Sequence, residues 1–267
     1  MQKKSKIIIV GSGITGASTA YHLTKLGWKD ITVIDQGPLF ETGGSTTHAP
    51  GGVFQTNPSR MMCKFAQHTV KLLSSLSYNG KPCYHPVGGI EVSKTKERHQ
   101  DLFRKMGLAH SYGLTEAKII SPEEVQKMGP YIDPKKIYGG YYVPNDGLAA
   151  PVRAVQAMAK YVTDENAGKF IGNTAVTGFK IVNNQIKGVE TEKGIFESDI
   201  VLVATGIWAP KIGRLAGISL PLVPCEHQMV WTEPFEELKE FKADMKEALV
   251  KHALVRHQDY SLYLRQW

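Results

Sequence analysis

The sequence predicts an α/β fold on the basis of three observations. Residues 6–34 have the pattern of a β-α-β unit. Residues 176–191 have the alternation and turns of an antiparallel hairpin, which leads into a strand at 200–204 that we expect to be buried. Residues 81–150, between these parts, contain strands and helices of their own. Together they predict a Rossmann-like domain interrupted by a discontinuous antiparallel-sheet domain.

The β-α-β unit is the most informative part of the chain. Lys6 to Val10 is a short β-branched run without a polar face, which is typical of a buried parallel strand. The motif G-x-G-x-x-G follows at 11–16, and a helical stretch runs from Ala17 to Leu26. The second strand, 31–34, ends at Asp35, which lies 19 positions after the last glycine.

The glycine positions suit a bound dinucleotide. Gly11 permits the tight turn, Gly13 lets the backbone approach a pyrophosphate, and Gly16 lets the helix pack closely on the strand. The helix N-terminus offers N–H groups to the phosphates, and the Asp35 carboxylate can accept hydrogen bonds from ribose hydroxyls. The pattern therefore predicts a dinucleotide site. The alternative is a glycine-rich turn in an ordinary α/β protein.

Composition narrows the class of protein further. A chain of 267 residues that is 42% hydrophobic can bury one large core or two small ones, and no apolar run reaches the length of a membrane span. The basic N-terminus enters a strand after five residues, which leaves no room for a leader and predicts a cytoplasmic location. Cys63, Cys83 and Cys225 form no C-x-x-C pair, which argues against a disulfide framework or a metal site.

The charge balance is basic, with 32 Lys and Arg against 25 Asp and Glu and a formal net charge of +7. A basic surface can attract nucleic acid, but the chain has no arginine-rich run or recognition module, so we expect no nucleic-acid partner. Attraction of an anionic cofactor and substrate is a second interpretation. A solvated surface without functional meaning is a third.

Local patterns predict the remaining elements. The glycine-rich loop at 43–52 indicates backbone that passes close to another group. Ser121, Pro122 and Glu124 have the arrangement of a helix start. Asn183-Asn184 and Lys193-Gly194 are typical turn pairs around the strands 176–182 and 185–191. We also expect helices at 59–76, 94–106 and 151–162, and strands at 86–92 and 138–143.

These elements divide the chain into four segments. We expect 1–80 and 151–215 to form a nucleotide-binding domain, and 81–150 and 216–267 to form a substrate domain. The strand that closes the nucleotide domain ends in Ala204-Thr205-Gly206.

Several segments together resemble a known family. A G-x-G-x-x-G unit at the N-terminus, a meander and a strand ending in Ala-Thr-Gly are similar to flavoproteins of the D-amino-acid oxidase type. More specific likenesses, from Lys6 to Arg265, are to dimethylglycine oxidase, dimethylglycine dehydrogenase and sarcosine dehydrogenase. They lie at 44–49 (GSTTHA), 53–59 (VFQTNPS), 143–149 (VPNDGLA), 226–228 (EHQ) and 256–259 (RHQD).

The resemblance implies FAD, attached covalently through His48. An ordinary loop histidine is the alternative. Thr47 replaces the tryptophan usual in the dehydrogenases, and Pro50 is a second departure. The residues that we expect at the cofactor are Gly11, Gly13, Ile14, Thr15, Gly16, Asp35, Gln36, Gly44, Ser45, Thr46, His48, Ala49, Val176, Ala204, Thr205, Gly206 and Trp208.

The resemblance also implies two residues on the substrate side. His227, in a segment that we expect to be a strand, would accept the proton of the substrate ammonium, a role that suits histidine near neutral pH. Tyr263 would position the substrate through its hydroxyl. Relatives continue beyond the position of Trp267 with the remaining strands, a last FAD helix and a folate-binding region. We therefore expect a truncated chain without the part that would bind tetrahydrofolate or the substrate carboxylate.

The expected activity is oxidative demethylation of an N-methylated glycine, with N,N-dimethylglycine converted to sarcosine as the first candidate. Hydride would leave an N-methyl carbon for the flavin, and the iminium would be hydrolysed to formaldehyde or captured by tetrahydrofolate. The electron acceptor, oxygen or an electron-transfer flavoprotein, stays open. Sarcosine or another secondary or tertiary amine is an alternative substrate. A nicotinamide-dependent Rossmann enzyme and a non-catalytic regulatory flavoprotein or fragment are the alternative classes.

Overall fold

The structure is a computed structural model that describes residues 4–41, 43–236, 238 and 250–266. The chain forms two compact units. The first contains Met1–Ala49 and Pro151–Gln228, and the second contains Pro50–Ala150 and Met229–Trp267. Each unit is therefore assembled from two separate stretches of sequence.

The first unit contains a six-stranded mixed sheet in the order β11-β2-β1-β14-β13-β12. The neighbours β11, β2, β1 and β14 run parallel, whereas β13 is antiparallel to both β14 and β12. The bounds are β1 Lys4–Val10, β2 Ile31–Ile34, β11 Gly168–Ile171, β12 Val176–Val182, β13 Gln185–Thr191 and β14 Gly194–Val203.

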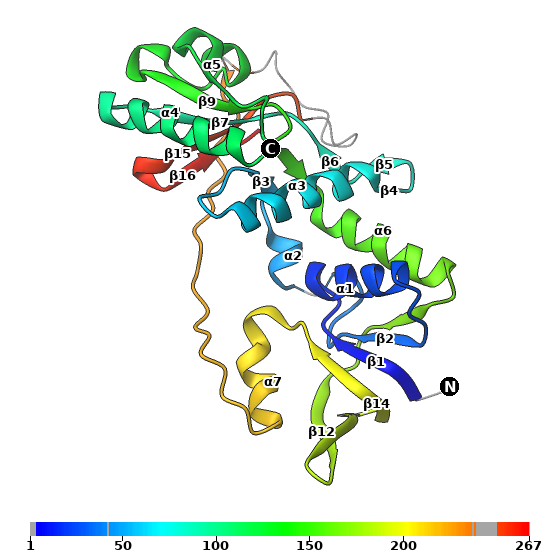
Figure 1. Ribbon diagram of the computed structural model, residues 1–267. Coiled ribbons are helices and arrows are strands. Elements are labelled where there is room, and N and C mark those ends of the chain that lie inside the picture. Colours follow the sequence, from blue (N-terminus) through cyan, green and yellow to red (C-terminus); the bar gives the residue numbers. More distant parts are fainter. Residues whose placement is uncertain (1–3, 42, 237, 239–249, 267) are drawn as a thin grey trace. The chain divides into compact units, whose positions relative to one another are not determined.

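Two helices of this unit, α1 (Ile14–Lys25) and α6 (Pro151–Asp164), lie side by side next to β1, β2 and β11 (Figure 1). The small residues Gly16, Ala17 and Ala20 are buried on α1, which lets the helix come close to its neighbours. The Tyr21 and Tyr161 rings also meet between the two helices, with centroids 4.9 Å apart. The shorter helices are α2 Ser45–His48, α7 Ala209–Leu215 and the 3-10 turn η2 Gly206–Trp208.

The second unit contains a five-stranded sheet in the order β16-β15-β7-β9-β8, in which only β15 and β7 run parallel. A three-stranded sheet, β3-β10-β6, and the hairpin β4-β5 complete it. The bounds are β3 Gly52–Val53, β4 Ser77–Tyr78, β5 Lys81–Pro82, β6 Tyr84–His85, β7 Gly89–Ser93, β8 Lys118–Ile120, β9 Gly139–Val143, β10 Gly147–Ala149, β15 Leu254–His257 and β16 Leu262–Leu264.

Helices cover the two faces of this five-stranded sheet. Leu102 and Ala109 of α4 (Lys96–Ser111) pack against Tyr141 and Val143 on one face, and Val125 of α5 (Pro122–Met128) packs on the other. The remaining helical elements are α3 Arg60–Ser75, η1 Pro134–Lys136 and η4 Gln258–Tyr260. No helix in the described ranges is both long and apolar enough to cross a membrane.

Most of the predicted elements are confirmed, and their ends have local causes. Ser121 and Glu124 form the expected capping box at α5. Asn183 and Asn184 both have positive φ, 51° and 59°, in the hairpin turn between β12 and β13. The helix expected at 94–106 begins at Lys96, because the Thr95 side chain accepts a hydrogen bond from the Arg98 N–H and caps it.

Three expectations about local structure were wrong. The strand at 200–204 is not buried throughout, since Val201 and Val203 pack on the core while Ile200, on the opposite face of β14, is 44% exposed. The loop at 43–52 contains the helical turn α2. The segment around His227 has no regular secondary structure and pairs with no strand in the described part of the chain, so it is not part of a sheet.

The boundaries of the compact units also differ from the expected segments. Residues 50–80, which we assigned to the nucleotide domain, lie in the second unit, because β3 pairs with β10 and α3 contacts β6. Residues 216–228 lie in the first unit, where Ile218 hydrogen-bonds to Gly213 of α7. The functions that we assigned to the domains stay predictions.

Candidate functional site

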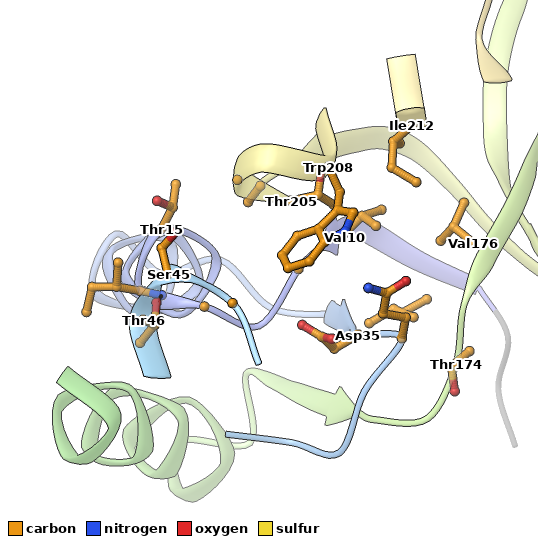
Figure 2. A pocket seen from close by; sticks show the side chains of 18 residues that line it. Val10, Thr15, Asp35, Ser45, Thr46, Thr174, Val176, Thr205, Trp208 and Ile212 are labelled. Carbon is orange, nitrogen blue, oxygen red and sulfur yellow. Dashed lines mark hydrogen bonds between the residues drawn. The ribbon is translucent and has the colours of Figure 1, made fainter. Parts of the chain in front are cut away.

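A cavity of about 160 Å³ lies at the ends of β1, β2 and β14 in the first unit (Figure 2). In an open parallel sheet this is the edge at which ligands bind, since the carboxyl ends of the strands and the helix N-termini meet there. Figure 2 shows the Trp208 indole pointing into the cavity, with Asp35 nearby. Asp35 is the only ionisable residue among those that line it.

The glycine loop packs against its surroundings without room for side chains. Gly11 has a φ of +107°, which L-residues rarely adopt, and a Cβ there would overlap the Ala204 carbonyl. A Cβ on Gly16 would overlap the carbonyl oxygen of Gly11. At Gly13 the nearest atom to an added Cβ is the Thr46 hydroxyl, at 3.1 Å. The loop can therefore adopt this conformation only with glycine at positions 11 and 16. Glycine at position 13 keeps open the space between the loop and Thr46.

The N-terminus of α1 is open toward the cavity. Its N-cap residue, Gly13, provides no side-chain cap, so the first-turn N–H groups lack intrahelical acceptors. One of them, the Ile14 N–H, donates to the Thr46 hydroxyl at 2.9 Å. This hydrogen bond ties the loop around α2 to the glycine motif, although the two are 32 positions apart in sequence.

Asp35 supports the glycine loop as well as lining the cavity. It is 8% exposed, and its Oδ2 accepts hydrogen bonds from the Ser12 N–H at 2.7 Å and the Ser12 hydroxyl at 3.0 Å. Its Oδ1 accepts from the Gly37 N–H at 3.0 Å. A carboxylate can accept about four hydrogen bonds in all, about two at each oxygen, so Oδ2 is already saturated and Oδ1 can accept one more.

The structure brings most of the predicted cofactor residues together around this cavity. Three of them do not line it: Gly16, His48 and Ala49. Four lining residues were missed by the sequence analysis: Val10, Ile34, Thr174 and Ile212. Val10 and Ile34 end β1 and β2, so the rule about strand ends was sufficient to find them.

Thr174 could not be found from its local sequence. It follows β11, a strand that the sequence analysis did not predict, and its N–H donates to the Asp35 carbonyl at 2.8 Å. Its hydroxyl accepts a hydrogen bond from Lys193 at 2.9 Å. This part of the cavity therefore depends on contacts between β2, β11 and the turn before β14.

His48 is exposed at the end of α2. Its Nδ1 lies 3.1 Å from the Gly44 carbonyl oxygen, and the Thr47 hydroxyl donates to the same carbonyl at 2.7 Å. A carbonyl can only accept, so this geometry assigns the proton of the neutral ring to Nδ1 and the free lone pair to Nε2.

The two substrate-side predictions fall in different units. His227 is exposed near the end of the first unit. Tyr263 is half-buried on β16, where it is paired with Arg256 of β15. Their proposed roles stay predictions.

The cavity fits a dinucleotide. The glycine loop forms a surface without side chains at a helix N-terminus, which suits a pyrophosphate. The hydroxyl oxygen of Thr205, which lines the cavity, is buried and has no hydrogen-bond partner in the described part of the chain. A bound ligand with a polar edge would satisfy this group. The fold and the cavity therefore define a dinucleotide-binding protein.

Comparison with protein-family models agrees with a dinucleotide-binding protein and identifies its family. Residues 6–267 match the DAO family, described as FAD dependent oxidoreductase. The chain therefore belongs to the FAD-dependent oxidoreductases of the D-amino-acid oxidase type, and the expected fold class is confirmed. The discontinuous mixed-sheet second unit is part of that fold.

Similarity to individual proteins indicates which oxidoreductases the chain resembles. The chain is 29% identical to human mitochondrial sarcosine dehydrogenase and 30% identical to human mitochondrial dimethylglycine dehydrogenase, in each case over 98% of the chain. It is 31% identical over 87% of its length to a mouse protein named pyruvate dehydrogenase phosphatase regulatory subunit. It spans only 28%, 29% and 26% of these relatives.

Among solved structures, L-proline dehydrogenase from P. horikoshii has a TM-score of 0.82 and 28% identity. The match covers 100% of this chain and 68% of that one. The chain is thus similar over nearly its full length to the sarcosine and dimethylglycine dehydrogenases and to this solved L-proline dehydrogenase.

Proposed function

We propose that this chain is the FAD-binding part of an enzyme that oxidises a C–N bond in an N-methylated glycine, with N,N-dimethylglycine as the first candidate substrate. The cavity at the glycine loop is the observation that carries the proposal, together with the similarity to dimethylglycine and sarcosine dehydrogenases. Sarcosine is the nearest alternative substrate. The electron acceptor, oxygen or a flavoprotein, and the cytoplasmic location stay predictions.

Three groups of residues would hold the cofactor. The pyrophosphate would lie at the N-terminus of α1, against Gly13 and the segment 44–46. Asp35 would accept a hydrogen bond from the ribose at Oδ1, and the buried hydroxyl of Thr205 would gain a partner. When bound, FAD supplies the acceptor for the hydride that leaves the N-methyl carbon.

His48 would carry a covalent link to the flavin through Nε2. The hydrogen bond from Nδ1 to the Gly44 carbonyl supports this choice of atom, because it leaves the lone pair of the neutral ring on Nε2. The exposed position of His48 at the end of α2 leaves this nitrogen accessible. In this proposal Thr47 holds the turn in place by its hydrogen bond to the same carbonyl.

His227 and Tyr263 would act on the substrate. A histidine can remove the ammonium proton, which frees the nitrogen lone pair that drives hydride out of the methyl group. A tyrosine hydroxyl on a paired strand can hold the substrate without moving a proton.

A second candidate function is regulatory, without turnover. The similarity to the mouse protein named as a phosphatase regulatory subunit favours it. A regulatory flavoprotein would bind FAD through the same cavity but would not be reduced by an N-methylated glycine.

The test examines the covalent attachment of the flavin and the oxidation of the substrate separately. Purified protein is precipitated with acid, and the pellet is examined for yellow colour, which only a covalent flavin retains. We expect colour in the wild-type pellet, none with His48→Ala, and retention with the control His22→Ala, which alters a histidine of α1 outside the cavity. Acid-stable flavin in His48→Ala would place the link elsewhere.

The second measurement tests turnover. Anaerobic bleaching of the flavin by dimethylglycine supports the proposed enzyme activity, and absence of bleaching would support the regulatory function.

A further inference from the structure

One wall of the nucleotide cavity is the turn between β11 and β12, residues 172–176, which we call the base turn. Two of its residues, Thr174 and Val176, line the cavity. Figure 2 shows both on the opposite side of Asp35 from Thr46. A dinucleotide with its pyrophosphate at the N-terminus of α1 and its ribose at Asp35 would therefore have its base against this turn.

Backbone hydrogen bonds join the base turn to the end of β2. The Thr174 N–H donates to the Asp35 carbonyl at 2.8 Å, and the Asn173 N–H donates to the Gly37 carbonyl at 2.8 Å. Asn173 has a φ of +49°, in the left-handed region that few residues other than glycine adopt. The turn thus depends on its contacts to keep this conformation.

Lys193, in the turn between β13 and β14, also contacts the base turn. Its Nζ donates to the Asn173 carbonyl at 2.6 Å and to the Thr174 hydroxyl at 2.9 Å, and the Gly172 carbonyl oxygen lies 3.5 Å away. An ammonium group has three donors, so this one side chain can serve all three acceptors. The contact joins residues about 20 positions apart in sequence.

The backbone that carries Lys193 is itself fixed. The Lys193 N–H donates to the Thr191 hydroxyl at 3.2 Å, and that hydroxyl donates to the Gly194 carbonyl at 2.7 Å. Thr191 is only 8% exposed and is paired with Val176 across the β12–β13 ladder. The lysine therefore reaches the base turn from a part of the sheet that adjoins the same wall of the cavity.

Thr174 explains why the ammonium matters for the cavity. This residue is 1% exposed, and its hydroxyl donates its single proton to the Gly172 carbonyl at 2.9 Å. The oxygen can then only accept, and Lys193 supplies a donor to it. Loss of the ammonium would remove that donor from a buried acceptor, which favours a rearranged base turn.

We propose that Lys193 is a positioning residue for FAD, which fixes the wall at the adenosine end of the cavity without lining the cavity itself. The inference rests on the proposed function for the identity of the ligand. The contacts of Lys193 with the base turn all lie within the first unit.

The test compares two ligands that share the adenosine end. All proteins carry His48→Ala, so that the flavin is held by non-covalent contacts alone and can be removed by dialysis. The affinity for FAD is measured from the quenching of flavin fluorescence. The affinity for ADP, which contains adenosine and a pyrophosphate but no flavin, is measured by calorimetry. Urea unfolding shows that each protein is folded under the conditions of the assay.

Lys193→Met keeps most of the side-chain length and removes the ammonium. We expect it to weaken binding of FAD and of ADP by the same factor, about 10-fold or more, because the wall at their common end is no longer fixed. Lys193→Arg keeps a charged donor and is expected to stay within about 3-fold of the parent protein. The control Lys187→Met removes a charge from β13 of the same hairpin, at a residue that pairs with Asp199 and does not line the cavity. It is expected to change neither affinity.

Equal losses for FAD and ADP in Lys193→Met alone support the proposal. Unchanged affinities in that variant overturn it, and so does a loss for FAD without a loss for ADP. An equal loss in Lys187→Met would assign the effect to net charge, and an equal loss in Lys193→Arg would exclude the hydrogen bonds as its cause, so either result overturns the proposal. If Lys193→Met does not fold, Lys193→Gln, whose shorter and neutral amide is a weaker donor, decides by the same criteria.

Failure of the proposed function gives a different result. A parent protein that binds no FAD overturns the proposed function and with it this role of Lys193. A parent protein that binds FAD, together with a Lys193→Met variant that binds it equally well, overturns only the role of Lys193.

Discussion

Each of the two units contains a cavity, and the two cavities are built from different kinds of groups. In the first unit the lining is mostly backbone, small side chains and hydroxyls, with Asp35 as its one ionisable residue. In the second unit a much smaller cavity contains Glu91, Lys105, Asp146 and Arg256. A site made of backbone depends on glycines and helix ends, and a site made of charges depends on pairing and desolvation.

Because the two cavities are lined by different kinds of groups, the two units tolerate different substitutions. In the first unit the critical atoms are main-chain atoms, so added volume is the most damaging change. In the second unit the critical groups are buried side chains whose charge is balanced by neighbours on other elements, so a change of ionisation matters most.

The largest expected effect is at Gly16. Gly16→Ala places a Cβ against the Gly11 carbonyl, which is backbone and cannot rotate away, so we expect the free energy of unfolding to fall by about 4 kcal/mol or more. Gly107→Ala in α4 is the matched control, because nothing lies within 4 Å of its Cβ position. It should stabilise the second unit by about 0.5–1 kcal/mol. Urea unfolding measures both, and equal effects would contradict the comparison.

A smaller effect, dependent on pH, is expected at Asp146. Its pKa is raised from 3.8 to about 7 by burial, so the native state keeps its proton while the unfolded chain ionises. This contribution to stability is complete below pH 4 and is lost as pH rises through 7. It amounts to about 2–4 kcal/mol.

Asp146→Asn keeps the size of the side chain and removes its titration. The difference in unfolding free energy between variant and wild type should therefore shift in favour of the variant from pH 4 to pH 7 and stay level above that. Glu91, Lys105 and Arg256 face the same group and are unchanged in the comparison. Parallel pH profiles of the two proteins would show that Asp146 titrates normally.

The smallest of the three effects is expected at Asp35. Asp35→Asn keeps one acceptor oxygen but cannot serve both Ser12 and Gly37, so we expect a loss of about 1.5 kcal/mol in unfolding free energy and weaker FAD binding. Asp133→Asn is the control in the second unit, where the exposed side chain caps η1 and asparagine caps equally well. FAD titration by flavin fluorescence is the second measurement. An unchanged affinity would mean that Asp35 supports the loop without contacting the cofactor.

Local sequence determined the elements whose causes lie within a few residues. Three such features are the Ser121 capping box, the Asn183-Asn184 turn and the glycine loop. Each depends on neighbours in the chain, so the local sequence pattern was sufficient to predict it. The nucleotide cavity followed from the same patterns because a β-α-β unit brings its own strand ends and helix N-terminus together.

Tertiary structure decided what depends on pairing between distant segments. The place of residues 50–80 in the second unit follows from strand pairing with β10, and Thr174 reaches the nucleotide cavity through β11 beside β2. Arg256 meets the buried Asp146 only because β15 joins the sheet next to β7. Local sequence was therefore sufficient to predict a dinucleotide-binding fold. The charge and position of the second cavity depend on the register in which distant strands pair, which local propensity does not encode.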